Sequence, residues 1–161
     1  MVETPEWDRA KGELRILGKR HLALDAEALC RHLDALVGQS VAEVIIGNHE
    51  SRLGKEDAER FRRGKPNASI EEIIETISET DLLSGVGLTK VTIQGSGESV
   101  SVEISNPYVK ETTGAAKSLL FEYWSGVFSY LFGKEYDSKG VYFNESTNVL
   151  TTRLVPRGRA G

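Results

Sequence analysis

Cysteine and histidine are scarce in this sequence, and their scarcity excludes several kinds of site. Among its 161 residues there is one cysteine, Cys30, so the chain cannot form an internal disulfide bond. Cys30 and His32 are two residues apart, which places them on different faces of a helix. The other histidines are His21 and His49, and no pair has the spacing of metal ligands. We therefore expect no metal ion.

The motifs that usually indicate catalysis or nucleotide binding are also missing. The sequence has no Gly-x-Gly-x-x-Gly pattern, no Walker loop and no Gly-x-Ser-x-Gly nucleophile elbow. Gly95-Ser-Gly97 joins two expected strands, so we interpret it as a hairpin turn. No set of residues assembles a nucleophile, a base and an oxyanion donor. The sequence thus gives no positive argument for an enzyme or for a cofactor.

Neither sign of charge is in strong excess. The formal net charge is −4, and the basic cluster between Arg60 and Lys65 lies beside acidic residues. We therefore expect no nucleic-acid partner. The first residues, Met1 to Leu14, are charged and do not resemble an apolar signal segment. Together with the single cysteine, this predicts a cytoplasmic protein.

One stretch dominates what the sequence does contain, namely residues 115–132, AAKSLLFEYWSGVFSYLF. It is about as long as five helical turns, and it holds half of the aromatic residues of the chain. Lys117 and Glu122 argue against a membrane span, which needs about 20 largely uncharged residues. We predict that this stretch is the central helix of the domain. A helical wheel gives it a flank of aromatic residues, Phe121, Trp124, Phe128 and Phe132, and a narrow stripe made of Ser118, Glu122, Ser125, Ser129 and Gly133.

The aromatic flank of this helix allows three interpretations. A helix that is apolar over most of its circumference must be covered on several sides, and most often the cover is simply the protein's own core. The flank could instead line a pocket for a ligand, or form an interface with a second subunit. Glu122 lies on the serine stripe, where we expect it to be solvated or hydrogen-bonded at the helix surface.

Helices are predicted before the central stretch. Asp25 can cap a helix over 26–37 that stops at Gly38. Ser40 and Glu43 form a Ser-x-x-Glu capping box, which predicts a second helix to about Ser51 and helical structure again after Gly54. A second box, Ser69 with Glu72, opens a helix over 70–79 that turns its isoleucines inward. The stretch before Asp25, residues 11–24, is expected to be extended.

Two β-hairpins complete the expected fold. Val100, Val102 and Ile104 alternate with polar residues, so residues 91–104 predict a hairpin with one buried face. Residues 138–156 predict a second hairpin that turns near Glu145–Asn148. This order of elements indicates an α+β domain, with N-terminal helices and the central helix packed on an antiparallel four-stranded sheet. We expect a single domain over residues 1–157 and a disordered tail over 158–161.

The central helix and the last hairpin carry a resemblance to a known family. Glu122, Tyr123, Trp124 and Gly126 match most of a motif Glu-Gly-(aromatic)-(aromatic)-x-Gly, with Tyr123 in place of its first glycine. Leu131-Phe-Gly133 and Leu154-Val-Pro156 match the following apolar turn and the final strand. Over roughly residues 11–157 the chain resembles the 4-vinyl-reductase-like domain family, which is similar in fold to the TRAPP vesicle-tethering subunits.

The resemblance implies a small-molecule-binding module that dimerises and encloses an apolar pocket. Many sensor members hold zinc through cysteines around the last hairpin, but here Asn144, Thr151 and Thr152 occupy that region, so the zinc function does not carry over. We therefore expect a non-enzymatic binding or sensor domain for a small hydrophobic, lipid-like or aromatic molecule, and a homodimer. A scaffold subunit resembling TRAPP subunits and a tetrapyrrole reductase accessory protein are the alternatives. The ligand-binding residues we expect are Phe121, Trp124, Phe128, Tyr108 and Tyr142.

Overall fold

A computed structural model of the chain describes residues 6–8, 13–16, 19–21, 25–110 and 112–158. The helices are α1 (Ala26–Val37), α2 (Gln39–Gly64), α3 (Ile70–Leu83) and α4 (Gly114–Phe132). The strands are β1 (Glu6–Asp8), β2 (Glu13–Ile16), β3 (Lys19–His21), β4 (Leu88–Gln94), β5 (Ser99–Ser105), β6 (Tyr136–Asn144) and β7 (Val149–Pro156). The α+β class, the two hairpins and the central helix between them are confirmed. The predicted tail, residues 158–161, lies outside the described residues except for Gly158.

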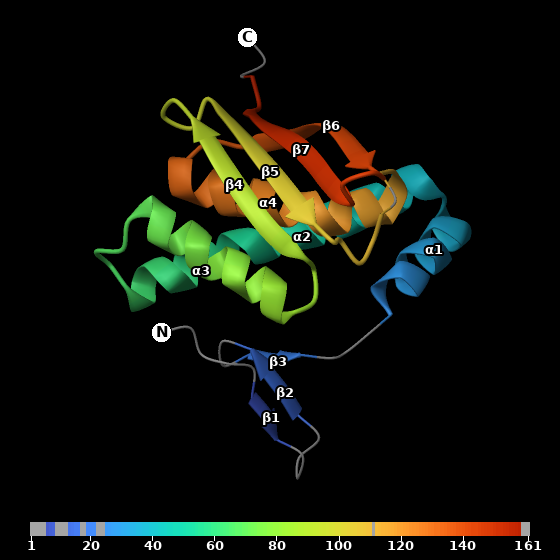
Figure 1. Ribbon diagram of the computed structural model, residues 1–161, viewed down its shortest axis with the longest axis horizontal. Helices are drawn as coiled ribbons and strands as arrows, with labels where there is room; N and C mark the ends of the chain where they lie inside the picture. The colour runs from blue at the N-terminus through green and yellow to red at the C-terminus, as the bar shows by residue number, and fades with distance from the viewer. Residues whose placement is uncertain (1–5, 9–12, 17–18, 22–24, 111, 159–161) are drawn as a thin grey trace.

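Helix α4 occupies the middle layer of the molecule (Figure 1). The four-stranded antiparallel sheet, in the order β4-β5-β7-β6, covers one side of it, and α2 covers the other. Helix α3 packs beside β4, and α1 packs against α2 and α4. The chain itself therefore supplies the cover that the apolar circumference of α4 requires. Within the described ranges, no helix has the combination of length and hydropathy that crossing a bilayer demands.

The sheet buries the face that the sequence alternation predicts. Val100, Val102 and Ile104 on β5 are fully buried, as are Leu150 and Leu154 on the neighbouring β7. The register pairs Val100 with Leu154 and Ile104 with Leu150, so the two strands present one continuous apolar surface to α4. Because successive side chains point to opposite faces, the polar residues between them form the outer face of the sheet.

Two of the predicted helix starts are confirmed and one is wrong. Asp25 caps α1, and Ser69 with Glu72 forms the capping box of α3. Helix α2, however, begins at Gln39 after Gly38, without a side-chain cap, so the box expected from Ser40 does not form. Its glutamate, Glu43, forms an ion pair with Lys117 of α4 instead. The tertiary contact therefore overrides the local signal, and α2 runs without a break to Gly64.

The short strands β1, β2 and β3 were not predicted as a sheet. They pair antiparallel in that order and form a sheet separate from the main one. Strands of three and four residues are too short to show an alternation in the sequence, which explains why only an extended stretch was expected. The extended prediction is confirmed where residues 13–16 and 19–21 form strands, and the rest of 11–24 lies outside the described residues.

Helices α2 and α4 touch backbone to backbone. A Cβ atom placed on Gly54 would overlap the carbonyl of Tyr123, and one placed on Gly126 would overlap the carbonyl of Ser51. Ser51, Gly54 and Ala58 recur at the three- and four-residue spacing of one helix face, so α2 presents a stripe of small residues to α4. Two helices can approach this closely only where both lack side-chain bulk at the crossing.

We expect Gly54→Ala to destabilise the protein by about 3 kcal/mol, because the added methyl group must push the two helix backbones apart. Gly64→Ala is the matched control in the same helix, since a Cβ at Gly64 meets nothing within 4 Å. The control should leave stability unchanged or raise it slightly, because alanine is the better helix former. Urea denaturation followed by circular dichroism measures both variants, and equal midpoints would contradict a close-packed crossing.

Candidate functional site

Three of the predicted ligand residues form part of a buried row of aromatic rings. Phe121, Trp124 and Phe128 are 0%, 1% and 0% exposed. The ring of Trp124 stacks on Phe128 with a centroid separation of 5.8 Å, and Phe128 stacks on Phe132 at 6.1 Å. Tyr136 of β6 leans against the last two rings. The helical spacing of three and four residues produces this row, and the sheet and α3 enclose it.

A buried carboxylate holds the indole end of this row. The Nε1 atom of Trp124 donates to Oδ2 of Asp81 at 3.0 Å, and the Thr89 hydroxyl donates to the same oxygen at 2.8 Å. Asp81 comes from the last turn of α3, and Thr89 from the start of β4. Burial raises the pKa of Asp81 to about 6, and the two hydrogen bonds oppose that rise because they favour the charged form.

Two further carboxyl groups lie on the α2 side of α4. The Tyr123 hydroxyl donates to Oδ2 of Asp57 at 3.2 Å. Burial raises the pKa of Glu50 to about 7, and the negative charge of Asp57 adds to the rise. Burial likewise holds the pKa of Tyr123 well above its ordinary value, and Asp57, Asp81 and Glu50 all contribute through their charge. Tyr123 and Trp124 therefore direct their polar atoms toward a set of acidic groups. Among the described residues no such set has the arrangement of a metal site.

Tyr108 lies at the edge of this interior. It follows β5 and is 38% exposed, whereas its neighbour Val109 is fully buried. Burial raises the pKa of Tyr108, and the charges of Cys30 and Glu50 raise it further. The charge of Glu50 thus contributes to the raised pKa of both Tyr108 and Tyr123.

Tyr142 lies apart from the other predicted ligand residues. It pairs with Thr151 on β7, next to the pair formed by Phe143 and the inward-facing Leu150. Because side chains alternate along a strand, Tyr142 projects from the outer face of the sheet, where it is 63% exposed. The structure therefore brings Phe121, Trp124 and Phe128 together, puts Tyr108 at the edge of the interior, and places Tyr142 on the opposite side of the sheet.

The interface interpretation of the aromatic flank is wrong. Phe121, Trp124 and Phe128 are buried within a single chain, so they offer no surface to a second subunit. The acidic partner of the flank, Asp81, was not predicted. A signal for Asp81 existed, because it falls four residues after Ile77 on the otherwise apolar face of α3.

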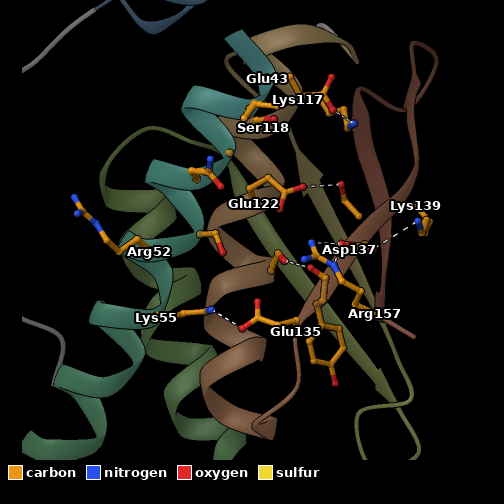
Figure 2. Close-up of a pocket in the computed structure, with 17 residues that line it drawn as sticks. Glu43, Arg52, Lys55, Lys117, Ser118, Glu122, Glu135, Asp137, Lys139 and Arg157 are labelled. Carbon is orange, nitrogen blue, oxygen red and sulfur yellow. Dashed lines mark hydrogen bonds and ion pairs between the residues drawn. The ribbon is translucent and has the colours of Figure 1, made fainter. Parts of the chain in front are cut away.

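A concave feature lies between α2, α4 and β6, and its lining includes Tyr136 but none of Phe121, Trp124 and Phe128 (Figure 2). It is an open groove of about 560 Å³ between α2, α4 and β6, and most of its lining is polar or charged. Three residues of the serine stripe, Ser118, Glu122 and Ser125, contribute to its lining. Glu122 accepts a hydrogen bond from Ser138 at 3.0 Å, in agreement with the expectation of a hydrogen-bonded residue.

The fold resembles that of a known small-molecule sensor. No family model matches the sequence, and no curated protein matches it either. Among solved structures, the phenol-responsive sensory domain of the transcription activator PoxR, determined with phenol, has a TM-score of 0.71 and 15% sequence identity. The match covers 94% of this chain and 84% of that chain. An H-NOX structure matches at a TM-score of 0.43 with 12% identity, covering 91% and 80% of the two chains, which is too distant to support any argument.

The PoxR match shows which fold this chain has. The chain has the fold of a small-molecule sensory domain, as the resemblance to the 4-vinyl-reductase-like family implied. At 15% identity the likeness extends to the fold alone. Membership of the 4-vinyl-reductase-like family and the relation to TRAPP subunits stay predictions.

The ionisation of Asp81 should make the stability of the fold depend on pH. Its pKa is raised from 3.8 to about 6, so the folded chain keeps a proton that the unfolded chain has already lost. The stability that this retained proton contributes to the folded state is fully present below about pH 4, and it is lost as the pH rises through about 6. Asp81→Asn preserves an acceptor for Trp124 but cannot ionise. The wild type loses stability between about pH 4 and pH 7, and the variant does not. We therefore expect the difference in unfolding free energy, variant minus wild type, to increase by on the order of 2 kcal/mol over this range.

Urea denaturation at several pH values measures this difference. Glu79→Gln, which changes an exposed carboxyl group on the same helix, is the control and should run parallel to wild type. If the Asp81→Asn curve also runs parallel, Asp81 does not ionise in this range and the pKa assignment fails.

Proposed function

We propose that this protein is a non-enzymatic binding or sensor domain for a small hydrophobic molecule, and that an aromatic alcohol suits it best. One observation carries the proposal: the buried aromatic row of α4 ends at Asp81, a carboxyl group that accepts hydrogen bonds. Ligand sites of this kind combine apolar and aromatic walls with a few polar groups that fix the orientation. The shared fold with a phenol-responsive sensory domain supports the same assignment.

The apolar part of the ligand is assigned to the aromatic row. Phe121, Trp124 and Phe128 provide flat surfaces on which another ring gains the extra attraction of stacked or edge-on aromatic pairs. A fatty-acid chain would gain only the free energy of burying its apolar surface, without the attraction between rings. We therefore prefer an aromatic ligand to a lipid-like one.

The polar part is assigned to Tyr108 and Glu50. A ligand hydroxyl that donates to the Glu50 carboxylate forms a charge-assisted hydrogen bond, which is stronger than a neutral one. Tyr108 is the proposed ligand residue on this side of the sheet that solvent reaches, so we place the entrance beside it. The ligand must displace protein side chains as it enters, because the three ring residues are at most 1% exposed in the free chain.

Fluorescence of Trp124 tests the proposal directly. The other tryptophan, Trp7, is replaced by phenylalanine so that the emission reports on Trp124 alone. We expect phenol and methylphenols to change this emission saturably, and Tyr108→Phe to weaken the binding of phenol about fivefold while leaving toluene unaffected. Tyr142→Phe is the matched control on the opposite face of the sheet and should bind both compounds like the parent.

Two outcomes would contradict the proposal. One is an unchanged emission across phenols and fatty acids, together with no copurified ligand in native mass spectra. The other is an equal effect of Tyr108→Phe and Tyr142→Phe on phenol affinity, which would remove Tyr108 from the site. A saturable response to fatty acids with none to phenols would exclude the aromatic ligand and leave the lipid-like class.

We further propose a homodimer, and we locate its interface away from α4. The end of α1 and the first turns of α2 expose several apolar side chains close together. Such a patch is unusual on a surface that is fully solvated. These residues are Leu36, Val37, Val41, Val44 and Ile45. The same surface also suits the alternative function, a scaffold or interaction subunit.

Ile45→Glu should separate the subunits. Ile45 is 48% exposed, so the substitution leaves the fold intact but places a charge within the proposed contact. We expect the dimer dissociation constant to rise at least about tenfold, as measured by light scattering over a concentration series. Leu82→Glu, a similarly exposed position at the end of α3, is the control. A monomeric wild type, or an equal effect of both variants, would contradict the assigned interface.

A further inference from the structure

The groove of Figure 2 has a floor of small and polar residues and a charged rim. Gly47 of α2 faces Glu122 of α4 across the groove. A Cβ atom at this position would lie 3.3 Å from the Glu122 side chain, so the absence of a side chain keeps this space open. On the opposite wall, Ser125 donates to the backbone carbonyl of Tyr136 at 2.5 Å, which fixes β6 against α4. Three packed elements therefore frame most of the groove, and Glu135 and Arg157 line it from just outside β6 and β7.

Glu122 places a negative group on the floor of this groove. Its hydrogen bond comes from the neutral hydroxyl of Ser138, and no ion pair within 4 Å involves Glu122 among the described residues. The positive charge of Lys117 favours the charged form of Glu122, but the ammonium group of Lys117 is paired with Glu43. Burial raises the pKa of Glu122 because the carboxylate has lost part of its water. A cationic ligand group would restore the missing partner.

The rim of the groove near the end of β7 has more positive than negative groups. Asp137 accepts two hydrogen bonds from Arg157, at 2.9 and 2.6 Å, and it also lies 3.8 Å from the ammonium group of Lys139. Two cations thus share one carboxylate. Arg157 and Lys139 are 63% and 62% exposed, so they can turn toward an additional anion at little cost.

The other charged groups of the groove form ion pairs, and one of them, Arg52, pairs at 3.7 Å with Glu56, which lies outside the lining. Lys55 pairs with Glu135 at 2.8 Å, and Lys117 pairs with Glu43. Arg157 and Glu122 line the same groove, and the charge of Glu122 contributes to the raised pKa of Arg157. The remaining pattern is one negative group on the floor and one positive excess on the rim.

We propose that this groove binds a small zwitterion with the charge pattern of a free amino acid. The ammonium group of the ligand pairs with Glu122, and its carboxylate bridges Arg157 and Lys139. The volume of about 560 Å³ leaves ample room for such a molecule. Because the groove is open and its floor is polar, the ligand side chain faces solvent, and amino acids with different side chains bind with similar affinity. The site is separate from the proposed aromatic site, which lies on the other flank of α4.

Nuclear magnetic resonance of the ¹⁵N-labelled protein tests this site with matched ligands. Free alanine and leucine are compared with their N-acetyl derivatives, which lack the ammonium group, and with their amides, which lack the carboxylate. We expect saturable shifts of the Ser138 and Glu122 amides with the free amino acids, and about tenfold weaker binding of each blocked form. Equal binding of free and blocked forms, or no saturable shift at these amides, would overturn the proposal.

Variants identify which end of the ligand each group contacts. Glu122→Gln should reduce the affinity for free alanine about tenfold and leave N-acetylalanine unaffected, because that ligand has no ammonium group. The double variant Arg157→Gln and Lys139→Gln should bind free alanine only as weakly as the wild-type protein binds alanine amide. Arg63→Gln, near the far end of α2, is the control and should change nothing. If Glu122→Gln weakens both ligands equally, Glu122 does not contact the ammonium group. The test uses neither phenols nor Tyr108, so its result is independent of the aromatic site.

Discussion

The close crossing of α2 and α4 is the constraint on which the rest of this structure depends. Gly54 and Gly126 let the two backbones touch, and a side chain at either position would overlap a carbonyl of the other helix. Contact at this distance fixes the rotation of α4 about its own axis, because Gly126 must face the backbone of Ser51 on α2. Once that face is fixed, the positions of the aromatic flank and of the serine stripe are fixed as well.

Trp124 of the aromatic flank and its neighbour Tyr123 then meet acidic groups. Trp124 reaches Asp81 of α3, and Tyr123 reaches Asp57 of α2. Burying carboxyl groups costs stability unless they are hydrogen-bonded, and the raised pKa values of Asp81 and Glu50 record part of that cost. The hydrogen bonds from Trp124 and Thr89 to Asp81 offset part of that cost and join α3, β4 and α4.

The serine stripe opens on the other side of α4 and produces a groove of different chemistry. Small hydroxyl side chains such as Ser125 let β6 approach α4, and Glu122 and Asp137 bring charges to the space that remains. One helix thus separates two environments, an interior of stacked rings and an open groove of paired charges. This separation follows from the helical period, which puts Trp124 and Glu122 on different faces although they are two residues apart.

The sequence by itself determined the α+β class, the central helix and the two hairpins, because these depend on periodicity, caps and turns that lie within short segments. The alternation of Val100, Val102 and Ile104 and the capping box of Ser69 are examples, and both are found in the structure. Only the tertiary structure decided that Ser40 caps nothing, that Tyr142 faces away from Trp124, and that Asp81 meets the indole. The contact of Asp81 with Trp124 joins residues 43 positions apart, and the direction of Tyr142 depends on how β6 pairs with β7, so no pattern within one segment encodes them.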